Sequence, residues 1–473
     1  MPTTTERPWL RSLLLAALLL CSVACIIVLR AVAPPADGPV VPFLQIWMLG
    51  FAPYLGAVLL VLLKKAPSGR WQWIEFAIIM FGALLMRAIL LPLPPDLSHD
   101  SWRYLWDARV TLYGYSPYVY GPGDTHFIAL RDFIYANSRF RNVPTIYPPG
   151  AQAIFLLSYL LAPSNLYFFK GILVLFELVT CAALALLLKR NGQDTSRIIL
   201  YAWCPLPIVE FALQGHLDAI TIMFTVLTLL CNTATWRGAR TLTGCLLALA
   251  TLTKIYPLVL LVVVLRRRDR ALLITCFATV ILGYVPYLIL GQGQVFGFFA
   301  TYASQSALNA GIVQIFVGWV GQRVGLAVSV TMLITYALDL VLVGGTALLV
   351  LVLRWRERIS MEVGALALIG AVFAASSHIF PWYTPVVLPL VAIIIGPLWT
   401  RAHGLNGNTI AALLAWYFAT LSILGYFQTN WNFYYLGVYD VVLLGLLLIA
   451  GRNTLRFLQK RAVLNVISSK NSK

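Results

Sequence analysis

A polar and aromatic stretch interrupts an otherwise apolar chain between about residues 93 and 148. Its first part, from Asp96 to Arg109, contains carboxylates, arginines, a histidine and several aromatic side chains. A carboxylate at a boundary between water and apolar surroundings can accept a proton from a hydroxyl group, and partial burial raises its pKa toward the working range. We therefore predict that Asp100 is a catalytic general base. Asp96, which follows two prolines, is the second candidate.

The remaining charged residues of this stretch have a structural interpretation beside the chemical one. Asp100 is three residues from Arg103, a spacing that also suits an ordinary helical ion pair. Asp107 and Arg109 are expected to form a network that supports the outer helix. His99 either hydrogen-bonds the substrate or the base, or simply lies next to the start of a helix.

The composition of the 473-residue chain indicates a membrane protein. Hydrophobic residues make up 60% of it and charged residues 11%, whereas a soluble domain carries about 25% charged residues. The seven cysteines lie in or beside apolar stretches and form no Cys-x-x-Cys pair, which favours packing over disulfides or a metal site. We predict an all-α polytopic membrane protein with about 11–13 transmembrane helices, each needing about 20 residues for a full span.

The basic residues predict how these helices are oriented. Lys and Arg collect in the short cytoplasmic loops of membrane proteins, and most of the 34 basic residues here lie in clusters between apolar segments. This pattern places both termini in the cytoplasm and the polar stretch outside it. The net charge of +17 is then an orientation signal, and nucleic acid is not an expected partner.

Four regions follow from this topology. Residues 1–92 are expected to hold N-terminal transmembrane helices, and residues 93–148 an extracytoplasmic catalytic loop with juxtamembrane helices. Residues 149–451 would form a transmembrane core with an internal cavity. Residues 452–473 are read as a basic cytoplasmic tail.

One segment of the core is too short for a regular pair of spans. Only about 25 residues separate Arg240 from Arg266, both expected inside, whereas two full spans need about 40. We predict a hairpin of two short helices that turns within the membrane, with Lys254 at its tip. Lysine is a suitable point charge for a phosphate group. The alternatives are extension toward the interface or an ion pair with Glu210 or Asp218.

Three further positions carry polar or aromatic side chains near the ends of apolar segments. His216 and Asp218 are candidates for binding a hydroxyl or phosphate group, and Asp218 equally suits a helix cap. His378, close to Trp382 and Tyr383, fits a platform for a phosphate and a sugar, although Trp and Tyr also collect at membrane interfaces.

Taken in order, several motifs resemble those of bacterial GT-C superfamily glycosyltransferases. They are the run from His99 to Arg109, Gly114-Tyr-Ser-Pro117-Tyr118, Thr145-Ile-Tyr147-Pro-Pro149, Trp203-Cys-Pro205, Gly215-His216-Leu-Asp218, Leu252-Thr-Lys254-Ile-Tyr256-Pro257 and Pro381-Trp382-Tyr383. The chain looks closest to the polyprenyl-phosphate-mannose-dependent mannosyltransferases, from about residue 85 to 390. It departs from them at Ala108, where relatives often have glycine between Asp and Arg.

The resemblance implies an inverting glycosyltransferase of the cell envelope. It would move a hexose, with mannose the expected sugar, from a polyprenyl-phosphate donor to an acceptor hydroxyl on the extracytoplasmic side of the cell membrane. Such families use an acidic residue of the first large outer loop as the base, which falls here on Asp100, with Asp96 second. The acceptor would be a glycolipid, a glycan or a protein. No cofactor is implied, and a divalent metal ion stays an open alternative.

The resemblance also suggests roles for the remaining candidates. The donor phosphate and sugar would contact Lys254, Arg103, His216, Asp218, His378 and Tyr383. Support of the acceptor or the loop would fall to His99, Asp107, Arg109 and Tyr147.

Two other functions compete with this interpretation. Broken helices and charge within the membrane also suit a transporter or lipid flippase, but no inverted repeat is visible and the polar residues lie on one side. An O-antigen-ligase-like enzyme with a diphosphate-linked donor would call for more arginines on the outer side than the sequence has.

Overall fold

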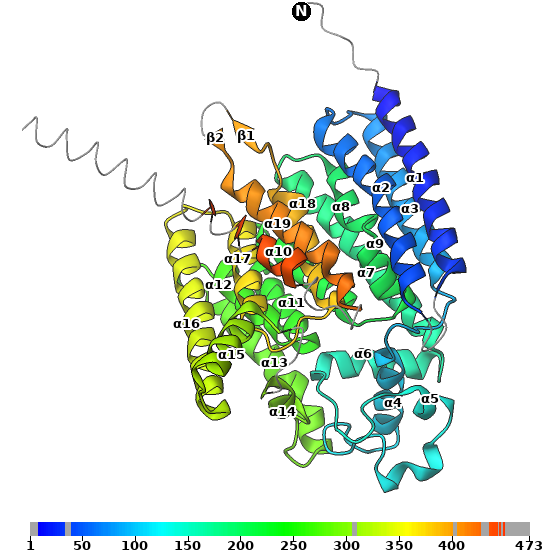
Figure 1. Cartoon of the computed structure of the whole chain (residues 1–473), viewed down its shortest axis with the longest axis vertical. Coiled ribbons are helices and arrows are strands. Elements are labelled where there is room, and N and C mark those ends of the chain that lie inside the picture. Colours follow the sequence, from blue (N-terminus) through cyan, green and yellow to red (C-terminus); the bar gives the residue numbers. More distant parts are fainter. Residues whose placement is uncertain are drawn as a thin grey trace, which may run out of the picture.

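The chain folds into a helical bundle with a separate layer of short helices and loops at one end (Figure 1). This computed structural model describes residues 8–33, 39–304, 310–400, 404–426, 435–442, 444, 445, 448 and 449. Within them the only strands are β1 (Trp399–Thr400) and β2 (Gly404–Leu405), which pair antiparallel. The predicted all-α polytopic membrane class is confirmed. The expected tail, 452–473, lies outside the described residues, and the expected last span, 433–450, is described only in part.

Seven of the described helices are long and apolar enough to cross a membrane. They are α1 (Pro8–Ala31), α2 (Val41–Leu63), α3 (Arg70–Leu90), α7 (Leu166–Arg190), α13 (Arg270–Leu290), α16 (Val328–Trp355) and α19 (Gly407–Leu421) with its extension to Tyr426. An eighth span is possible if the bent pair Thr195–Ala202 and Pro205–Leu213, which meet at 50°, is counted as one.

This number is lower than the predicted 11–13, because several apolar segments form helices that are too short for a full span. The short apolar helices are α6 (Pro149–Leu161), α10 (Asp218–Asn232), α11 (Ala239–Thr253), α17 (Met361–Ala374) and the segment Pro381–Ile394, which contains α18 (Val387–Ile394). Hydropathy marks such segments as apolar without fixing where the helix ends. They surround the interior of the bundle, where α10 packs between α7 and α11, and α11 packs on α13.

The predicted hairpin is present, with Lys254 at its turn. The helix α11 ends there in extended backbone (φ −148°, ψ 143°), and the chain returns through the 3₁₀ turn η4 (Tyr256–Leu260) and α12 (Leu261–Val264). Arg240, at the start of α11, donates to the carbonyl of Val264 at 2.7 Å. The two ends of the hairpin therefore meet, and its tip points into the bundle.

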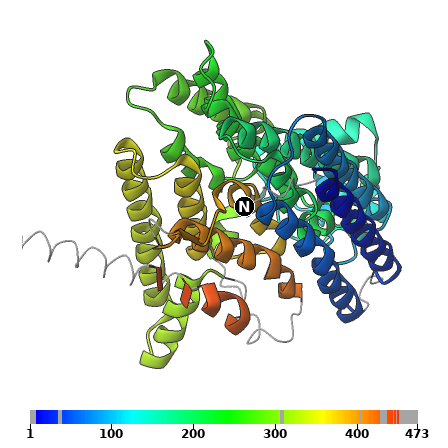
Figure 2. The same cartoon turned by 90° about the horizontal axis from the view of Figure 1, so that it is seen from above.

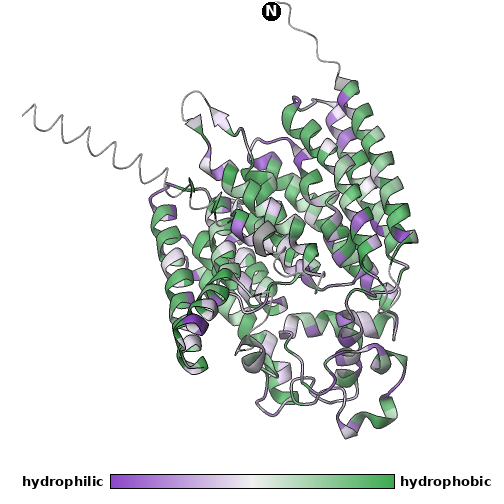
Figure 3. Ribbon diagram, viewed as in Figure 1, coloured by the Kyte–Doolittle hydropathy of each residue, from purple (hydrophilic) through white to green (hydrophobic). Residues whose placement is uncertain are grey.

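The polar stretch lies at the end of the bundle opposite the start of α1 (Figure 1). It contains α4 (Asp100–Leu112), the 3₁₀ turn η1 (Thr125–Leu130) and α5 (Phe133–Asn137), and α6 lies across the bundle next to them. The long helices are mostly hydrophobic, whereas this end carries more hydrophilic residues (Figure 3). Seen from above, α1–α3 and α16 occupy opposite sides of the molecule (Figure 2).

A buried ion pair joins the N-terminal helices to the core. The Arg87 guanidinium on α3 lies 2.5 Å from the Glu177 carboxylate on α7, and both side chains are fully buried. Arg87 also donates to the carbonyl of Ala202 at 2.8 Å, which links α3 to the first helix of the bent pair.

We expect Glu177→Ala to lower the free energy of unfolding by about 3–5 kcal/mol, because it leaves a buried, uncompensated guanidinium. Thermal unfolding of the purified protein in detergent measures the loss. The double variant Arg87→Met/Glu177→Leu removes both charges and should lose less. An equal loss in the double variant would show that packing, and not the unpaired charge, is what matters here.

Candidate functional site

Two side chains of the core fix the segment that leads into α4. Leu97 and Ser98 donate their backbone N–H groups to the Gln214 side-chain oxygen, both at 3.1 Å. The Lys170 ammonium on α7 donates to the carbonyl of Leu93 at 2.6 Å. The sequence alone gave no role to Gln214 and did not identify Lys170, although a lysine within an apolar helix was an available signal. These contacts determine where α4 begins and so where Asp100 lies.

Gly215 permits a close approach between the start of α4 and the segment that contains Gln214. Gly215 has a φ of +74°, and a Cβ atom there would lie 3.2 Å from the Cβ atom of Ser101. The left-handed conformation is costly for other residues. The turn at Gly215 therefore brings the start of α4 against the start of α10, where Asp218 is located.

We expect Gln214→Leu to lower kcat about tenfold or more, because small misplacements of a reacting group can cost up to about 10²-fold. The variant removes the only acceptor that the described structure gives to the N–H groups of Leu97 and Ser98. Steady-state kinetics of the transfer reaction proposed below measures the effect. Gln193→Leu is a matched control, because Gln193 donates to the carbonyl of Ile393, away from α4. Full activity of Gln214→Leu would contradict the positioning role.

Asp100, the first residue of α4, lies at the polar end of the bundle and keeps part of its surface accessible. Burial raises the pKa of Asp100 to about 6, an effect that Lys254 opposes and Asp218 reinforces through their charges. The structure thus brings these three residues into one electrostatic group. At neutral pH the carboxylate is ionised and basic enough to accept a proton. Burial also raises the pKa of Asp96, which is influenced by Lys170 and not by this group.

Lys254 faces a carboxylate and an aromatic ring. Its ammonium lies 2.6 Å from Asp218 Oδ1 and 3.4 Å from the centre of the Tyr383 ring, and its side chain is 13% exposed. The ion pair with Asp218 was one of the alternatives open from the sequence, and the structure contains it. A charged lysine held at the tip of the hairpin is able to interact with an anionic ligand.

Aromatic rings form a stacked wall next to Lys254. Tyr302, on α14 (Phe299–Ser304), stacks on His378 with ring centres 4.3 Å apart, and its hydroxyl lies 3.1 Å from that of Tyr383. Burial lowers the pKa of His378, which favours its neutral form. The sequence did not identify Tyr302, whose short helix has no distinguishing pattern.

His216 lies deeper than the other candidates. It is fully buried, stacks on Trp382 with ring centres 3.8 Å apart, and places Nε2 3.4 Å from Glu210 Oε2. Tyr426 donates its hydroxyl to the same Glu210 oxygen at 3.1 Å. These contacts make His216 part of the support behind the aromatic wall, and a direct contact with a ligand stays a prediction.

The charged residues of α4 other than Asp100 form ion pairs and hydrogen bonds with other residues of the polar end. Arg103 donates to Asp107 at 2.7 Å and to the carbonyls of Phe140 and Val143 at 2.9 and 3.0 Å. The alternative ion pair between Asp100 and Arg103 is therefore replaced by one with Asp107. All three nitrogens of this guanidinium have acceptors, one on α4 and two in the loop, and binding of a donor phosphate by Arg103 stays an untested prediction.

Arg109, Asp107 and His99 make contacts of the same kind. Arg109 pairs with Asp132 at 2.8 Å, and the Gln152 amide donates to Asp107 at 3.2 Å. The His99 ring nitrogen Nδ1 lies 3.2 Å from the carbonyl of Asn137. Asp107 and Arg109 thus make contacts of the kind expected for them, which connect α4 to Gln152 and Asp132.

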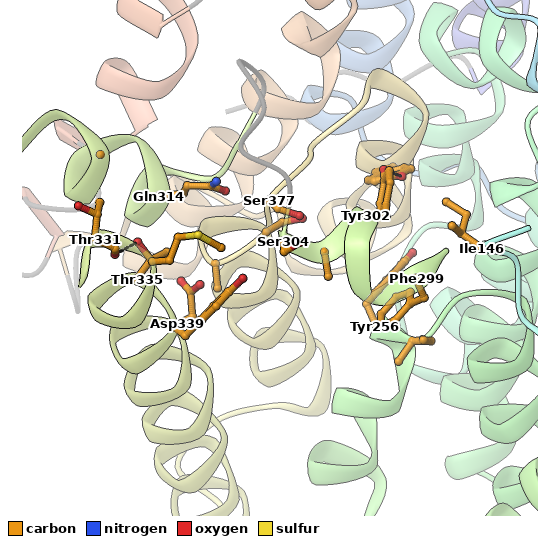
Figure 4. Close-up of a pocket in the computed structure, with 18 of the residues that line it drawn as sticks. Ile146, Tyr256, Phe299, Tyr302, Ser304, Gln314, Thr331, Thr335, Asp339 and Ser377 are labelled. Carbon is orange, nitrogen blue, oxygen red and sulfur yellow. Dashed lines mark hydrogen bonds between the residues drawn. The ribbon is translucent and has the colours of Figure 1, made fainter. Parts of the chain in front are cut away.

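A cavity of about 750 Å³ opens beside Lys254. The wall at this end includes Tyr147, Lys254, Tyr302 and Tyr383, and the opposite wall is built from α15 (Ile312–Val324) and α16 (Figure 4). Asp100 and Asp96 are not among the lining residues. The Asp100 charge nevertheless acts on Tyr147 and Tyr302, so Asp100 lies near this wall.

No group of three or more His, Cys, Asp or Glu side chains in the described part of the chain is arranged to hold a metal ion. The functional groups that the structure brings together here are two carboxylates, a lysine, tyrosine hydroxyls and stacked rings.

Comparison with known proteins identifies a family. The sequence model of the family described as Glycosyltransferase family 87 matches residues 145–381, just over half of the chain. The matched part contains His216, Asp218, Lys254 and His378, and it begins after α4 and Asp100. No curated protein and no solved structure matches the chain significantly.

Proposed function

We propose that this chain, which belongs to glycosyltransferase family 87 and is a membrane glycosyltransferase, transfers a hexose from a polyprenyl-phosphate donor to an acceptor hydroxyl in a single inverting displacement. The observation that carries the proposal is the position of Lys254. It lies at the tip of the hairpin formed by α11, η4 and α12, on the cavity wall, and within the electrostatic influence of Asp100. A cation for the leaving group and a base for the nucleophile are thus close together.

In this mechanism Asp100 removes the proton of the acceptor hydroxyl as its oxygen attacks the anomeric carbon. The bond between that carbon and the phosphate oxygen breaks, and the electron pair leaves with the lipid phosphate. The phosphate gains negative charge in this step, which the Lys254 ammonium stabilises. Asp100 then releases its proton to water. The anomeric configuration is inverted, so a β-linked donor gives an α-linked product.

The aromatic wall supplies the remaining contacts. Tyr302 and Tyr383 present hydroxyl groups at the end of the cavity occupied by Lys254. Stacked rings and tyrosine hydroxyls are suited to the apolar faces and the hydroxyls of a sugar. Mannose is the sugar we propose, on the strength of the sequence resemblance described above.

The orientation belongs to the same proposal. The polar end and the start of α1 lie at opposite ends of the bundle (Figure 1). With the N-terminus in the cytoplasm, as the basic residues predict, the base and the cavity face the extracytoplasmic side. The donor lipid tail would then lie in the bilayer next to the cavity.

Donor selectivity tests the proposal. The purified protein in lipid nanodiscs is incubated with synthetic polyprenyl-phosphate-mannose, a polyprenyl-diphosphate-linked sugar or a nucleotide-activated mannose, and with a mixture of octyl hexosides as acceptors. Mass spectrometry of the products should show transfer from the monophosphate donor alone. Transfer from the diphosphate donor would support the ligase-like alternative, and uptake by proteoliposomes without glycoside formation would support a transporter.

A further inference from the structure

The two ends of the cavity differ in chemistry. One end presents Lys254, Tyr302 and Tyr383, where we place the donor phosphate and sugar. The other end is lined by α15 and α16 and has a carboxylate, Asp339, instead of a cation (Figure 4). A carboxylate repels phosphate, so the two ends are suited to different ligands.

Polar side chains follow one face of each helix at the carboxylate end. Their spacing of about one or two helical turns places them on a common face. The set comprises Gln314 and Gln322 on α15, and Thr331, Thr335 and Asp339 on α16. Figure 4 shows Gln314, Thr331, Thr335 and Asp339 on the same side of the cavity, with Tyr256 and Phe299 across from them. The remaining faces of α16 are apolar and exposed, for example at Leu333, Leu340 and Val341.

Asp339 is an unusual residue at this depth. It lies about 16 Å along α16 from Val328, at 1.5 Å per residue, within an apolar membrane helix. Its Oδ1 atom is buried without a hydrogen-bond partner, and within the described residues no basic side chain forms an ion pair with it. An ionisable residue inside a membrane is costly and marks a function. The sequence analysis did not identify it, although a lone carboxylate in a predicted span was an available signal.

We propose that the α15–α16 end of the cavity binds the saccharide of the acceptor, with Asp339 accepting hydrogen bonds from neighbouring hydroxyl groups. A carboxylate has two oxygens that can accept from two hydroxyls at once, and the glutamine and threonine side chains both donate and accept. This inference rests on the proposed function, because it assigns the second substrate of the same reaction.

The size and the shape of the cavity agree with this assignment. A volume of about 750 Å³ exceeds what one hexose needs and lies within the usual range of about 300–1,000 Å³ for small-molecule sites. A saccharide held at Asp339 would extend toward Lys254 and the Tyr147 side of the wall, which is the side near Asp100. The donor and the acceptor would therefore meet at the lysine end.

Binding measurements on the whole protein in nanodiscs, free of sugar detergents, test the inference. The probes are methyl and octyl α- and β-glycosides of mannose, glucose and galactose, and separately a polyprenyl phosphate. We expect at least one glycoside to bind the wild type, and Asp339→Asn to weaken that binding at least tenfold without changing polyprenyl phosphate binding. The matched control is Leu340→Ala on the exposed face of α16, which should change neither.

A stability measurement separates recognition from a structural role. Asp339→Leu removes a carboxyl group whose buried Oδ1 atom has no hydrogen-bond partner, so its thermal unfolding temperature should equal or exceed that of the wild type. A lower temperature together with lost glycoside binding would indicate a structural role and overturn the inference.

The remaining outcomes are also decisive. No bound glycoside, or equal binding by the wild type and Asp339→Asn, would overturn the inference and leave the donor proposal standing. Absence of both polyprenyl phosphate binding and sugar transfer would instead refute the proposed function. Tighter binding of octyl than of methyl glycosides would identify a lipid-linked acceptor, and equal binding a free saccharide.

Discussion

Asp100→Asn is expected to lower kcat about 10²–10⁴-fold, the range that general base catalysis contributes. The amide keeps the shape of the side chain but cannot accept the proton of the acceptor hydroxyl. Single-turnover transfer from polyprenyl-phosphate-mannose measures the loss. The comparison variant is Asp96→Asn, which should retain most of the activity because Asp96 lies outside the group formed by Asp100, Asp218 and Lys254.

The pH dependence of the wild type tests the same assignment. Asp100 must be ionised to act as a base, and burial raises its pKa to about 6. We therefore expect kcat/KM to be independent of pH well above 6 and to fall about tenfold per pH unit below it. An acidic limb near the ordinary carboxyl pKa would contradict the assignment of Asp100 as the base. Full activity of Asp100→Asn together with a loss in Asp96→Asn would transfer the role of base to Asp96.

The hairpin around Lys254 shows what sequence reasoning can predict about this fold. The positions of the basic residues were sufficient to predict the hairpin. Arg240 and Arg266 are expected on the same side, and the chain between them is too short for two spans. Geometry then requires a turn inside the bundle, and Lys254 occupies it. The full number of spans was not predictable in this way, since α10 and α17 are apolar but too short for a full span.

The candidate site shows where such reasoning ends. Contact of Arg103 with a phosphate stays a prediction, and the sequence did not indicate that the carbonyls of Phe140 and Val143 accept hydrogen bonds from its guanidinium. Backbone acceptors contributed by a distant loop leave no pattern in the sequence. The same is true of Gln214, whose role depends on two N–H groups more than a hundred residues away. Residue type identified Asp100 and Lys254 as candidates, but only the fold shows that their charges interact.

Lys254→Met is expected to lower kcat by about 10²–10³-fold, comparable to the loss of one donor that stabilises a developing negative charge. The phosphate gains charge as its bond to the sugar breaks, so the lysine interacts more strongly with the transition state than with the bound donor. The decrease should therefore appear mainly in kcat and less in KM. Lys254→Arg, which retains a positive charge, should keep more activity than the methionine variant.

The ion pair with Asp218 requires a second variant. Removing only the lysine leaves a buried carboxylate without its partner, which destabilises the protein. The double variant Lys254→Met/Asp218→Asn removes both charges, and we expect it to fold, with a thermal unfolding temperature closer to that of the wild type, and to remain inactive. Recovery of activity in the double variant would show that the single variant failed through instability, and it would remove Lys254 from the mechanism. Inactivity with restored stability would leave stabilisation of the leaving phosphate as the function of this lysine.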